Sequence, residues 1–340
     1  MRVELGEVCE RGSSNLKQSD VSKMNGKYPI YGASGYIGNV DFYHQDQPYV
    51  AVVKDGAGIG RTTLHPAKSS VIGTMQYLLP KENILPEYLF YVVKYMHLEK
   101  YFTGATIPHI YFKDYQHEEF NLDPIEKQVK IVTVLKKCEK IIDDRKKEMQ
   151  LLDDLIKARF VEMFGDVIHN DRKWECQQFS DITTSRLGKM LDTKHQTGTC
   201  KYPYLANFNV QWFRFELGNL NEMDFNEKER EEFCLEDGDL LVCEGGEIGR
   251  CAVWHNQIKK CFFQKALHRV RCNQDIILPD YLSWWFKYNC ENGGFTAIEG
   301  AKATISHLTG TKMKMLDVTV PPIELQEQFV DIIHQVDKSK

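Results

Sequence analysis

Two glycine-rich segments come closest to a chemical site in this chain. The first is Asp55-Gly56-Ala57-Gly58-Ile59-Gly60-Arg61, and Glu244-Gly245-Gly246-Glu247-Ile248-Gly249-Arg250 is similar to it. A phosphate-binding P-loop would need a glycine in place of Asp55 and a lysine in place of Arg61, and a dinucleotide fingerprint would need one more residue between its glycines. We therefore interpret the first segment as a tight turn that brings backbone N–H groups and Arg61 close to an anionic group.

No complete catalytic motif accompanies these turns. The sequence has no Asn-Pro-Pro-aromatic motif of an adenine methyltransferase, no convincing acidic cluster followed by Glu-x-Lys, and no histidine pair at zinc-ligand spacing on one helix. Its ten cysteines stand singly, without the Cys-x-x-Cys pairs typical of structural zinc. We therefore predict a chain that is not an enzyme, binds no metal or cofactor itself, and packs reduced cysteines as small hydrophobic residues.

The composition is typical of a folded protein with two domains. The 340 residues are 42% hydrophobic and long enough for two separate cores. We find neither an apolar run long enough to span a bilayer nor the apolar core of a secretion signal, and so expect a soluble, cytoplasmic protein. The net charge of −5 does not indicate nucleic-acid binding, for which a basic domain is the usual sign.

The strongest signal in the sequence is an internal repeat. Landmarks occur twice in the same order, which makes chance a poor explanation. The pairs are Leu5–Val8 with Phe179–Ile182, Lys27–Pro29 with Lys201–Pro203, Ile59–Arg61 with Ile248–Arg250, Leu85–Leu89 with Leu278–Leu282, Thr106–His109 with Thr304–His307, and Pro124–Gln128 with Pro322–Gln326. The chain therefore consists of two similar units, which we place at residues 1–124 and 166–321.

Each unit has the pattern of a mixed α+β domain. Short apolar segments such as Tyr49–Val53 and Asp239–Val242 are bounded by Gly, Asp and Asn, which indicates strands and turns. A helix is predicted from Pro86 to about Lys100 and another from Pro279 to about Asn289. Proline suits the first turn of both helices, because its missing N–H would have no partner there.

A long helix is predicted to follow the first unit, at residues 125–165. Apolar residues follow a heptad period, interrupted at Arg145 and Arg159, and the opposite face is charged. This pattern favours a coiled-coil seam over an ordinary core helix, on a rod of roughly 60 Å. The seam residues are Ile131, Leu135, Cys138, Ile142, Met149, Leu152, Ile156 and Met163. A matching helix begins in the segment 322–340 and is short.

Two tandem domains, each followed by a helix, closely resemble the specificity (S) subunits of type I restriction-modification systems. The resemblance rests on the duplicated glycine turns, the two Leu-Pro-x-Tyr-Leu helix starts and the two Pro-Ile-Glu-x-Gln segments. The end of the long helix, residues 157–166, adds to it. The resemblance covers nearly the whole chain. No single motif is specific for the family, but the combination of these motifs, each present twice, is.

The resemblance implies an α+β fold with two tandem target recognition domains, the first followed by a long coiled-coil helix and the second by a short one. Each domain would read one half of a split double-stranded DNA target, and the helices would fix the gap between the halves. Methyltransferase (M) subunits would bind beside the domains and methylate adenine with S-adenosylmethionine. Restriction (R) subunits, where present, would use ATP and Mg to translocate and cut DNA.

The short C-terminal helix departs from the family pattern. Members normally carry a second helix about as long as the first, so the outer seam around Met149 to Met163 is expected to lack a partner within the chain. Another subunit, or a second copy of the chain through self-association, would then cover this apolar stripe. The departure puts the docking of a second methyltransferase subunit in doubt.

DNA binding by an acidic chain requires segregated basic residues, or partners that neutralise phosphates. Side chains of Asn, Gln, Arg and Lys can hydrogen-bond to base edges, and Lys and Arg also hold phosphates. The candidates in the first unit are Arg11, Ser13, Asn15, Lys54, Arg61, Lys68, Thr106 and His109. The candidates in the second unit are Arg186, Lys189, Lys194, Asn207, Asn209, Gln211, Arg214, Arg250, Lys265, Lys302 and His307.

Some of these candidates have a competing interpretation. The segment Asn207–Arg214 interleaves amides with aromatic residues and looks most like a reading surface, but an amphipathic strand with a solvated polar face would give the same pattern. Arg61 and Arg250 occupy equivalent places, so we expect a generic contact such as one to phosphate, with a surface salt bridge as the alternative. Trp284 and Trp285 are expected in the core.

Three functions stay open at this point. A DNA-reading subunit fits best. A scaffold or regulatory protein that occupies methyltransferase subunits without forming a full complex is the second, and a methylation-only system is related to it. A stand-alone enzyme is the weakest, because no complete catalytic motif is present.

Overall fold

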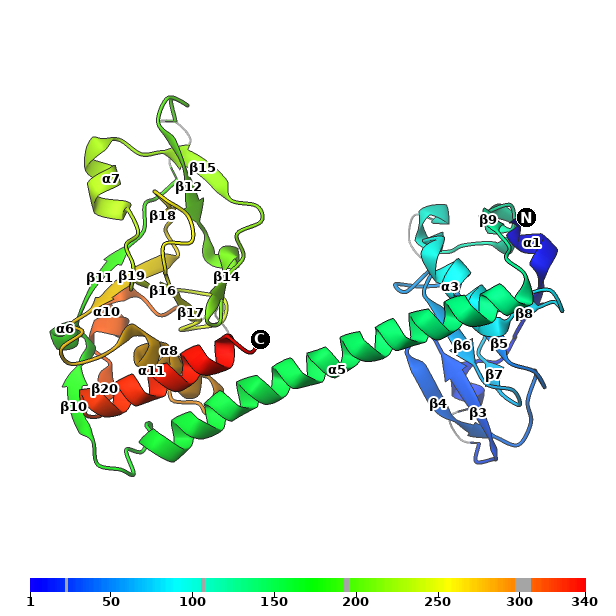
Figure 1. Ribbon diagram of the computed structural model, residues 1–340, viewed down its shortest axis with the longest axis horizontal. Helices are drawn as coiled ribbons and strands as arrows, with labels where there is room; N and C mark the ends of the chain where they lie inside the picture. The colour runs from blue at the N-terminus through cyan, green and yellow to red at the C-terminus, as the bar shows by residue number, and fades with distance from the viewer. Residues whose placement is uncertain (22–23, 105–107, 192–195, 297–306) are drawn as a thin grey trace. The chain divides into compact units, whose positions relative to one another are not determined.

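The main sheet of the first unit is built around the predicted strand Tyr49–Val53, which is β5 and is buried along its whole length. The sheet has the order β2-β8-β5-β6, and every neighbouring pair is antiparallel. The computed structural model describes residues 1–21, 24–104, 108–191, 196–296 and 307–340 (Figure 1). The chain forms two units, Met1–Arg145 and Lys146–Lys340.

Two smaller sheets complete the first unit: β4-β3-β7, in which β3 and β7 run parallel, and the pair β1-β9. The elements are β1 (Arg2–Glu4), α1 (Leu5–Val8), β2 (Cys9–Ser13), α2 (Gln18–Val21), β3 (Tyr28–Gly32), β4 (Gly35–Val40), β5 (Tyr49–Val53), β6 (Thr62–His65), β7 (Ser70–Val71), β8 (Met75–Pro80), α3 (Pro86–Tyr95), the 3-10 helix η1 (Leu98–Tyr101), α4 (Phe112–Tyr115), β9 (Glu119–Asn121) and α5 (Ile125–Phe164).

The second unit repeats the three sheets of the first and adds an antiparallel pair, β13-β14. Its main sheet has the order β11-β19-β16-β17, its second sheet is β15-β12-β18 with β12 and β18 parallel, and β10 pairs with β20. The elements are β10 (Glu175–Gln178), α6 (Phe179–Ile182), β11 (Thr183–Leu187), β12 (Lys201–Leu205), the 3-10 helix η3 (Asn207–Asn209), β13 (Val210–Gln211), β14 (Arg214–Phe215), β15 (Asn221–Asp224), α7 (Glu227–Phe233), β16 (Leu240–Cys243), β17 (Cys251–Val253), β18 (Phe262–Phe263), β19 (Leu267–Cys272), α8 (Pro279–Glu291), α10 (Gly310–Lys314), β20 (Asp317–Val320) and α11 (Ile323–Asp337).

A buried glutamine joins the helices of each unit. Gln128, in the first turn of α5, accepts a hydrogen bond from Leu85 N at 2.9 Å and donates to Asn83 O and Asp123 O at 2.9 and 2.8 Å. Gln326, in the first turn of α11, does the same with Leu278 N and with the carbonyls of Ile276 and Pro321. Leu85 and Leu278 are the N-cap residues of α3 and α8, so each carboxamide fixes the start of one helix to the start of another.

The helix predicted from Pro86 to about Lys100 is shorter than expected. α3 ends at Tyr95, because His97 adopts a left-handed backbone with φ of 52°, and η1 follows from Leu98. The prediction for α8 holds, since this helix runs from Pro279 to Glu291. Trp284 and Trp285 on α8 are in the core, as expected.

The long helix α5 runs from Ile125 to Phe164 without a break, as the sequence predicts. Its first turns pack on the core of the first unit through Ile131 and Val132. Its last turns pack on the core of the second unit through Ile156, Phe160 and Phe164. Residues 141–150, between these turns, are all exposed. At both ends the apolar stripe therefore lies on a globular core, which the heptad pattern alone did not favour.

The bare part of the seam lies earlier in α5 than the sequence suggested. Ile156 is buried, and Leu152 and Met163 pack against the second core, so the expectation that these residues lack a partner is wrong. The short helix α11 is the reason, because Phe329 lies 5.5 and 5.3 Å from Phe160 and Phe164 between ring centroids. The exposed seam residues are Cys138, Ile142 and Met149.

Four of the ten cysteines are buried as small side chains within the two units. They are Cys9, Cys243, Cys251 and Cys261, and desolvation raises the pKa of each thiol. Protonated thiols are poor metal ligands and nucleophiles. No helix among the described residues combines the length and the apolar character that crossing a membrane requires.

Replacement of the buried glutamine should destabilise either unit. Gln128→Ala would leave one N–H and two carbonyl groups without their partner, which predicts a loss of about 2–4 kcal/mol in the free energy of unfolding. Gln128→Glu should also destabilise, because a carboxylate keeps the acceptor but loses both donors. Urea unfolding of the two variants and of Gln326→Ala measures these losses. Values near zero would show that the glutamine bonds do not anchor the helices.

The stability of the first unit should fall in mild acid because of His65. This residue lies on β6 with its ring 4.4 and 5.3 Å from those of Tyr31 and Tyr49, and burial lowers its pKa to about 4. Since the folded pKa is below the unfolded value of about 6.5, the stabilisation is complete above pH 6.5 and is lost progressively as the pH falls toward 4.

A series of urea-unfolding experiments between pH 7 and pH 4 measures this effect, with an expected loss of up to about 3 kcal/mol. His65→Gln should reduce the part of the pH dependence of the unfolding free energy that comes from the first unit. His268 in the second unit also has a lowered pKa because of burial, so it remains as an internal reference. An unchanged pH dependence in His65→Gln would contradict the assignment.

Candidate nucleic-acid interface

The two glycine turns connect inner strands to their neighbours in the main sheets, β5 to β6 and β16 to β17. An equivalent backbone hydrogen bond closes the base of each turn. Val53 N donates to Arg61 O at 2.9 Å, and Cys243 N donates to Arg250 O at 2.8 Å. The carbonyl of the next residue in each turn accepts a hydrogen bond from the segment that carries the repeated histidine. Lys54 O accepts from Ile110 N, and Glu244 O accepts from Leu308 N. The first turn is therefore one residue longer, and the sequence match of Asp55 with Glu244 is wrong.

Asp55 corresponds instead to Gly245, and the repeated histidine has a different environment in each unit. His109 forms an ion pair with Asp55, and its ring lies 4.0 Å from that of Tyr111. His307 is exposed and lies so close to Gly245 that a Cβ atom there would be 2.9 Å from Nδ1. The first unit thus holds its histidine with a carboxylate, whereas the second presents it over bare backbone.

The repeated arginines hold the same backbone position in each unit. Arg61 donates to Ala33 O at 3.0 Å, and Arg250 donates to Asn207 O at 3.1 Å. Ala33 and Asn207 are equivalent, since both follow the strand that begins at the repeated Lys-Tyr-Pro. The shared contact is a hydrogen bond within the domain, and Arg250 also pairs with Glu247 at 3.8 Å, in line with the salt-bridge alternative for that residue. Arg61 remains exposed, so a phosphate contact stays a prediction for it.

The segment Asn207–Arg214 uses its amides to hold its own turn. Asn209 is buried, accepts from Ala206 N at 2.9 Å and donates to Glu216 O at 2.9 Å. Asn207 donates to Gly245 O at 2.8 Å and accepts from Arg250 at 2.7 Å. Gln211 donates to Phe208 O, and Arg214 pairs with Glu216. These contacts give the amides a structural role, and a role in reading bases has no direct support from them.

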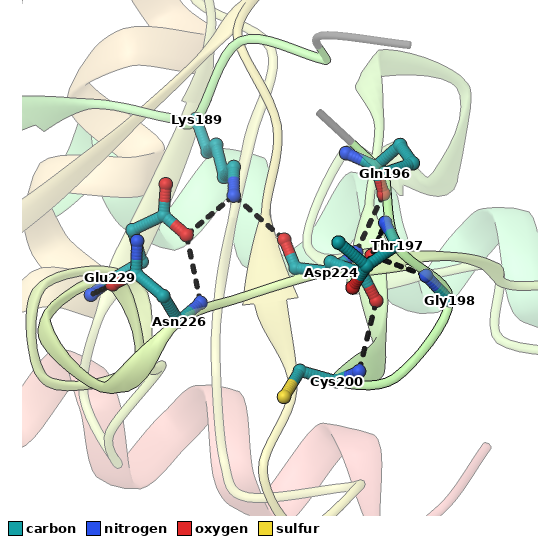
Figure 2. A network of polar contacts seen from close by, with 8 residues as sticks. All are labelled: Lys189, Gln196, Thr197, Gly198, Cys200, Asp224, Asn226 and Glu229. Atoms are coloured by element: carbon teal, nitrogen blue, oxygen red, sulfur yellow. Dashed lines mark hydrogen bonds and ion pairs between the residues drawn. The ribbon is translucent and has the colours of Figure 1, made fainter. Parts of the chain in front are cut away.

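Lys189 is likewise part of an internal network (Figure 2). Its Nζ lies 2.6 Å from Glu229 Oε2 and donates to Asp224 O at 2.7 Å. The Asp224 carboxylate accepts from Gly198 N at 2.7 Å and Cys200 N at 3.0 Å, and these backbone bonds, that of Gly198 above all, lower its pKa. The network fastens the segment 196–200 to the end of β15 and ties the segment after β11 to α7.

An open cleft of about 1310 Å³ lies beside this network in the second unit. Its walls come from β11 and the residues after it, from the segment 196–200, from α7 and from the start of α10. Arg186, a predicted contact, lines the cleft and pairs there with Glu232. The cleft is lined by polar and apolar side chains and by both signs of charge, and its polar groups could form hydrogen bonds to a ligand.

The remaining candidates divide by exposure. Arg11, Ser13, Asn15, Lys68 and Lys265 are exposed, and Lys54 is partly buried beside Asp55. Arg11 and Ser13 lie on β2 and Arg186 on β11, the equivalent edge strands of the two main sheets. Thr106, Lys194 and Lys302 lie outside the described residues. Within the described part of the chain, no group of His, Cys, Asp and Glu is placed to hold a metal ion.

One exposed cation was missed by the sequence analysis. Lys260 stands two residues before β18, as Lys68 stands two residues before β7, and the two strands occupy the same place in their sheets. Both lysines have a left-handed backbone, with φ of 54° and 56°. No shared motif surrounds them, so only the common topology reveals the match. A lysine presented in the same way by both units suits a contact to phosphate.

A family model for the type I restriction modification DNA specificity domain matches residues 1–152 and 171–340 of the chain. The chain belongs to this family. Among curated members, a Haemophilus influenzae protein named as a type I restriction enzyme specificity subunit is 20% identical over 97% of the chain and 85% of its own length. The Methanocaldococcus jannaschii MjaIX specificity subunit is 26% identical over 31% of the chain and 29% of its own length.

Solved structures show the fold of the family over the whole chain. The crystal structure of a type I restriction-modification S subunit from M. genitalium has a TM-score of 0.61 at 13% identity, and the match covers 100% of this chain and 89% of that one. A chain from a structure on complex assembly and conformational transition of the type I system has a TM-score of 0.56 at 14% identity, with 100% and 90% covered. The fold of two tandem α+β specificity domains is thereby confirmed.

The exposed and the internally bonded candidates should respond differently to substitution. Lys68→Ala and Lys260→Ala should each weaken binding to any duplex and lower the salt slope of log K by about 1, without loss of stability. Lys189→Ala should instead lower the free energy of unfolding, because it leaves Glu229 and the segment 196–200 less well held. Fluorescence anisotropy at several salt concentrations, together with urea unfolding, measures both. Salt slopes that stay at the wild-type value would remove the two lysines from the interface.

Proposed function

We propose that the chain is the DNA-reading subunit of a type I restriction-modification complex and that each unit reads one half of a split target. The observation that carries the proposal is the complete repetition of one sheet framework in a member of the specificity family. Two similar units can present two similar surfaces to two parts of a duplex, while loops that differ between them read different bases. The turns around Asp55 and Gly245 differ in this way.

The acidic balance of the chain makes partners part of the proposal. Internal pairs such as Lys189–Glu229 and Arg271–Asp239 remove as many cations as carboxylates, so pairing leaves the net charge at −5. This excess of negative charge opposes the approach of the phosphate backbone, so the chain alone should bind duplex DNA weakly. We infer that methyltransferase subunits supply much of the phosphate neutralisation in the assembled complex.

The chemistry of the complex would belong to those partners. Methyltransferase subunits would bind S-adenosylmethionine and methylate adenine, and restriction subunits, where present, would use ATP and Mg. The family supports this division, because its specificity subunits recognise DNA without catalysing a reaction. The role of this chain is to position those subunits at the target.

The proposal is tested by sequencing DNA, with detection of modified bases, from a host that carries the chain and its methyltransferase. Deletion of this gene alone should abolish adenine methylation at one motif with two separated halves. The double variant Lys265→Ala, His307→Ala in the second unit should change or relax only one half. Tyr36→Ala, at an exposed residue of the first unit, serves as a control that should leave the motif unchanged.

Two outcomes would contradict the proposal. Methylation that persists without the chain would show that another protein reads the target. A purified complex that binds DNA with no sequence preference would favour the second hypothesis, in which the chain is a scaffold for methyltransferase subunits.

A further inference from the structure

One carboxylate stands where two hollows of the second unit meet. Glu244 is the first residue after β16, and it lines both the cleft of about 1310 Å³ and an adjoining pocket of about 470 Å³ that Lys265 and His307 also line. Its backbone is fixed, because its N–H donates to Ala266 O at 2.9 Å and its carbonyl accepts from Leu308 N. Its partly buried carboxylate has no hydrogen bond or ion pair to any other described residue.

A buried histidine lies in the wall of the cleft beside this carboxylate. His268 on β19 pairs with Val242, and Glu244 follows two residues later on the same face of β16. His268 is 3% exposed, and its Nε2 is buried without a hydrogen-bond partner among the described residues. Burial lowers the pKa of the imidazole, and the nearby Glu244 opposes this shift. A buried nitrogen without a partner in a cleft wall is accounted for if a ligand bonds to it.

The equivalent positions of the first unit carry a different pair. Lys54 corresponds to Glu244 through the backbone bonds of the two glycine turns. Gln76 corresponds to His268 through the register of the two main sheets. Gln76 is 5% exposed and donates to Gly12 O, so its amide has a partner within the unit. The two units therefore share one backbone framework but present charges of opposite sign at the same place.

A carboxylate and an ammonium group select opposite base edges in the major groove. A carboxylate only accepts hydrogen bonds, so it suits the exocyclic amino group of adenine or cytosine and disfavours the carbonyl oxygen of guanine or thymine. An ammonium group only donates, so it suits those carbonyl oxygens. A neutral imidazole beside the carboxylate can also donate to N7 of adenine, which would give that base a paired contact.

We propose that Glu244, with His268 beside it, reads a base with an exocyclic amino group in the half-site of the second unit. Lys54, at the same place in the first unit, reads a base with a carbonyl oxygen in the other half-site. The inference rests on the proposed function, since it takes each unit as the reader of one half. Reversal of the base pair under Glu244 would replace the amino group by a carbonyl oxygen on the strand that it faces, so the reversed pair should be rejected.

The test uses the chain assembled with its methyltransferase, and duplexes in which each base pair of the wild-type motif is reversed in turn. The quantity measured is the methylation rate of the motif divided by that of each reversed duplex. Glu244→Gln should lower this ratio by about tenfold or more at one position of one half, because an amide both accepts and donates. The matched control is Glu231→Gln, which changes an exposed carboxylate of the second unit outside the cleft and should leave every ratio unchanged.

A second set of variants exchanges the two pairs. Glu244→Lys combined with His268→Gln gives the second unit the residues that the first unit already holds at these places. This variant should favour the reversed base pair at the position that Glu244→Gln relaxes. Lys54→Glu combined with Gln76→His should change the preference at one position of the other half.

Two results would overturn the inference and leave the proposed function intact. The first is a Glu244→Gln complex whose ratios all stay at the wild-type values. The second is an equal fall in the methylation rate of every duplex, because a contact that ignores the base would weaken all of them alike. A wild-type complex that methylates no split motif would instead contradict the proposed function itself, so the two failures are distinguishable.

Discussion

The carboxamide of one buried glutamine in each unit sets the geometry on which the rest of the unit depends. Only a carboxamide offers an acceptor and two donors at the end of a side chain of this length. Gln128 and Gln326 use all three on backbone groups from separate segments. Each bond satisfies a backbone group beside the buried carboxamide, so the crossing of the two helices is fixed at their first turns.

The sheets and turns of each unit are arranged on this helical base. Inner strands β5 and β16 are buried, and each ends in a glycine turn at the sheet margin. Arg61 and Arg250 then brace the turn against Ala33, just after β3, and Asn207, two residues after β12. Rigid strands with braced turns are a suitable support for recognition, because side chains on the turns can change while the support stays the same.

Sequence reasoning predicted the repeat, the strand at Tyr49–Val53, the helix at Pro279 and the long helix α5, since each depends on local pattern. The length difference between the glycine turns stayed hidden, because Asp55 and Glu244 are both acidic and only the bonds to Ile110 and Leu308 reveal the register. The internal roles of Asn209 and Lys189 were missed for a related reason. A polar residue type does not show whether its partner lies within the chain or outside it.

The exposed stretch 141–150 has a consequence for how the chain can change in evolution. Side chains that touch neither core place no packing constraint on the number of residues there. Each added residue would shift the following turns by about 1.5 Å and rotate them by about 100°, while seven residues would restore nearly the original face. Insertions of whole heptads would therefore alter spacing in discrete steps and leave both cores intact, whereas single-residue insertions would mainly alter orientation.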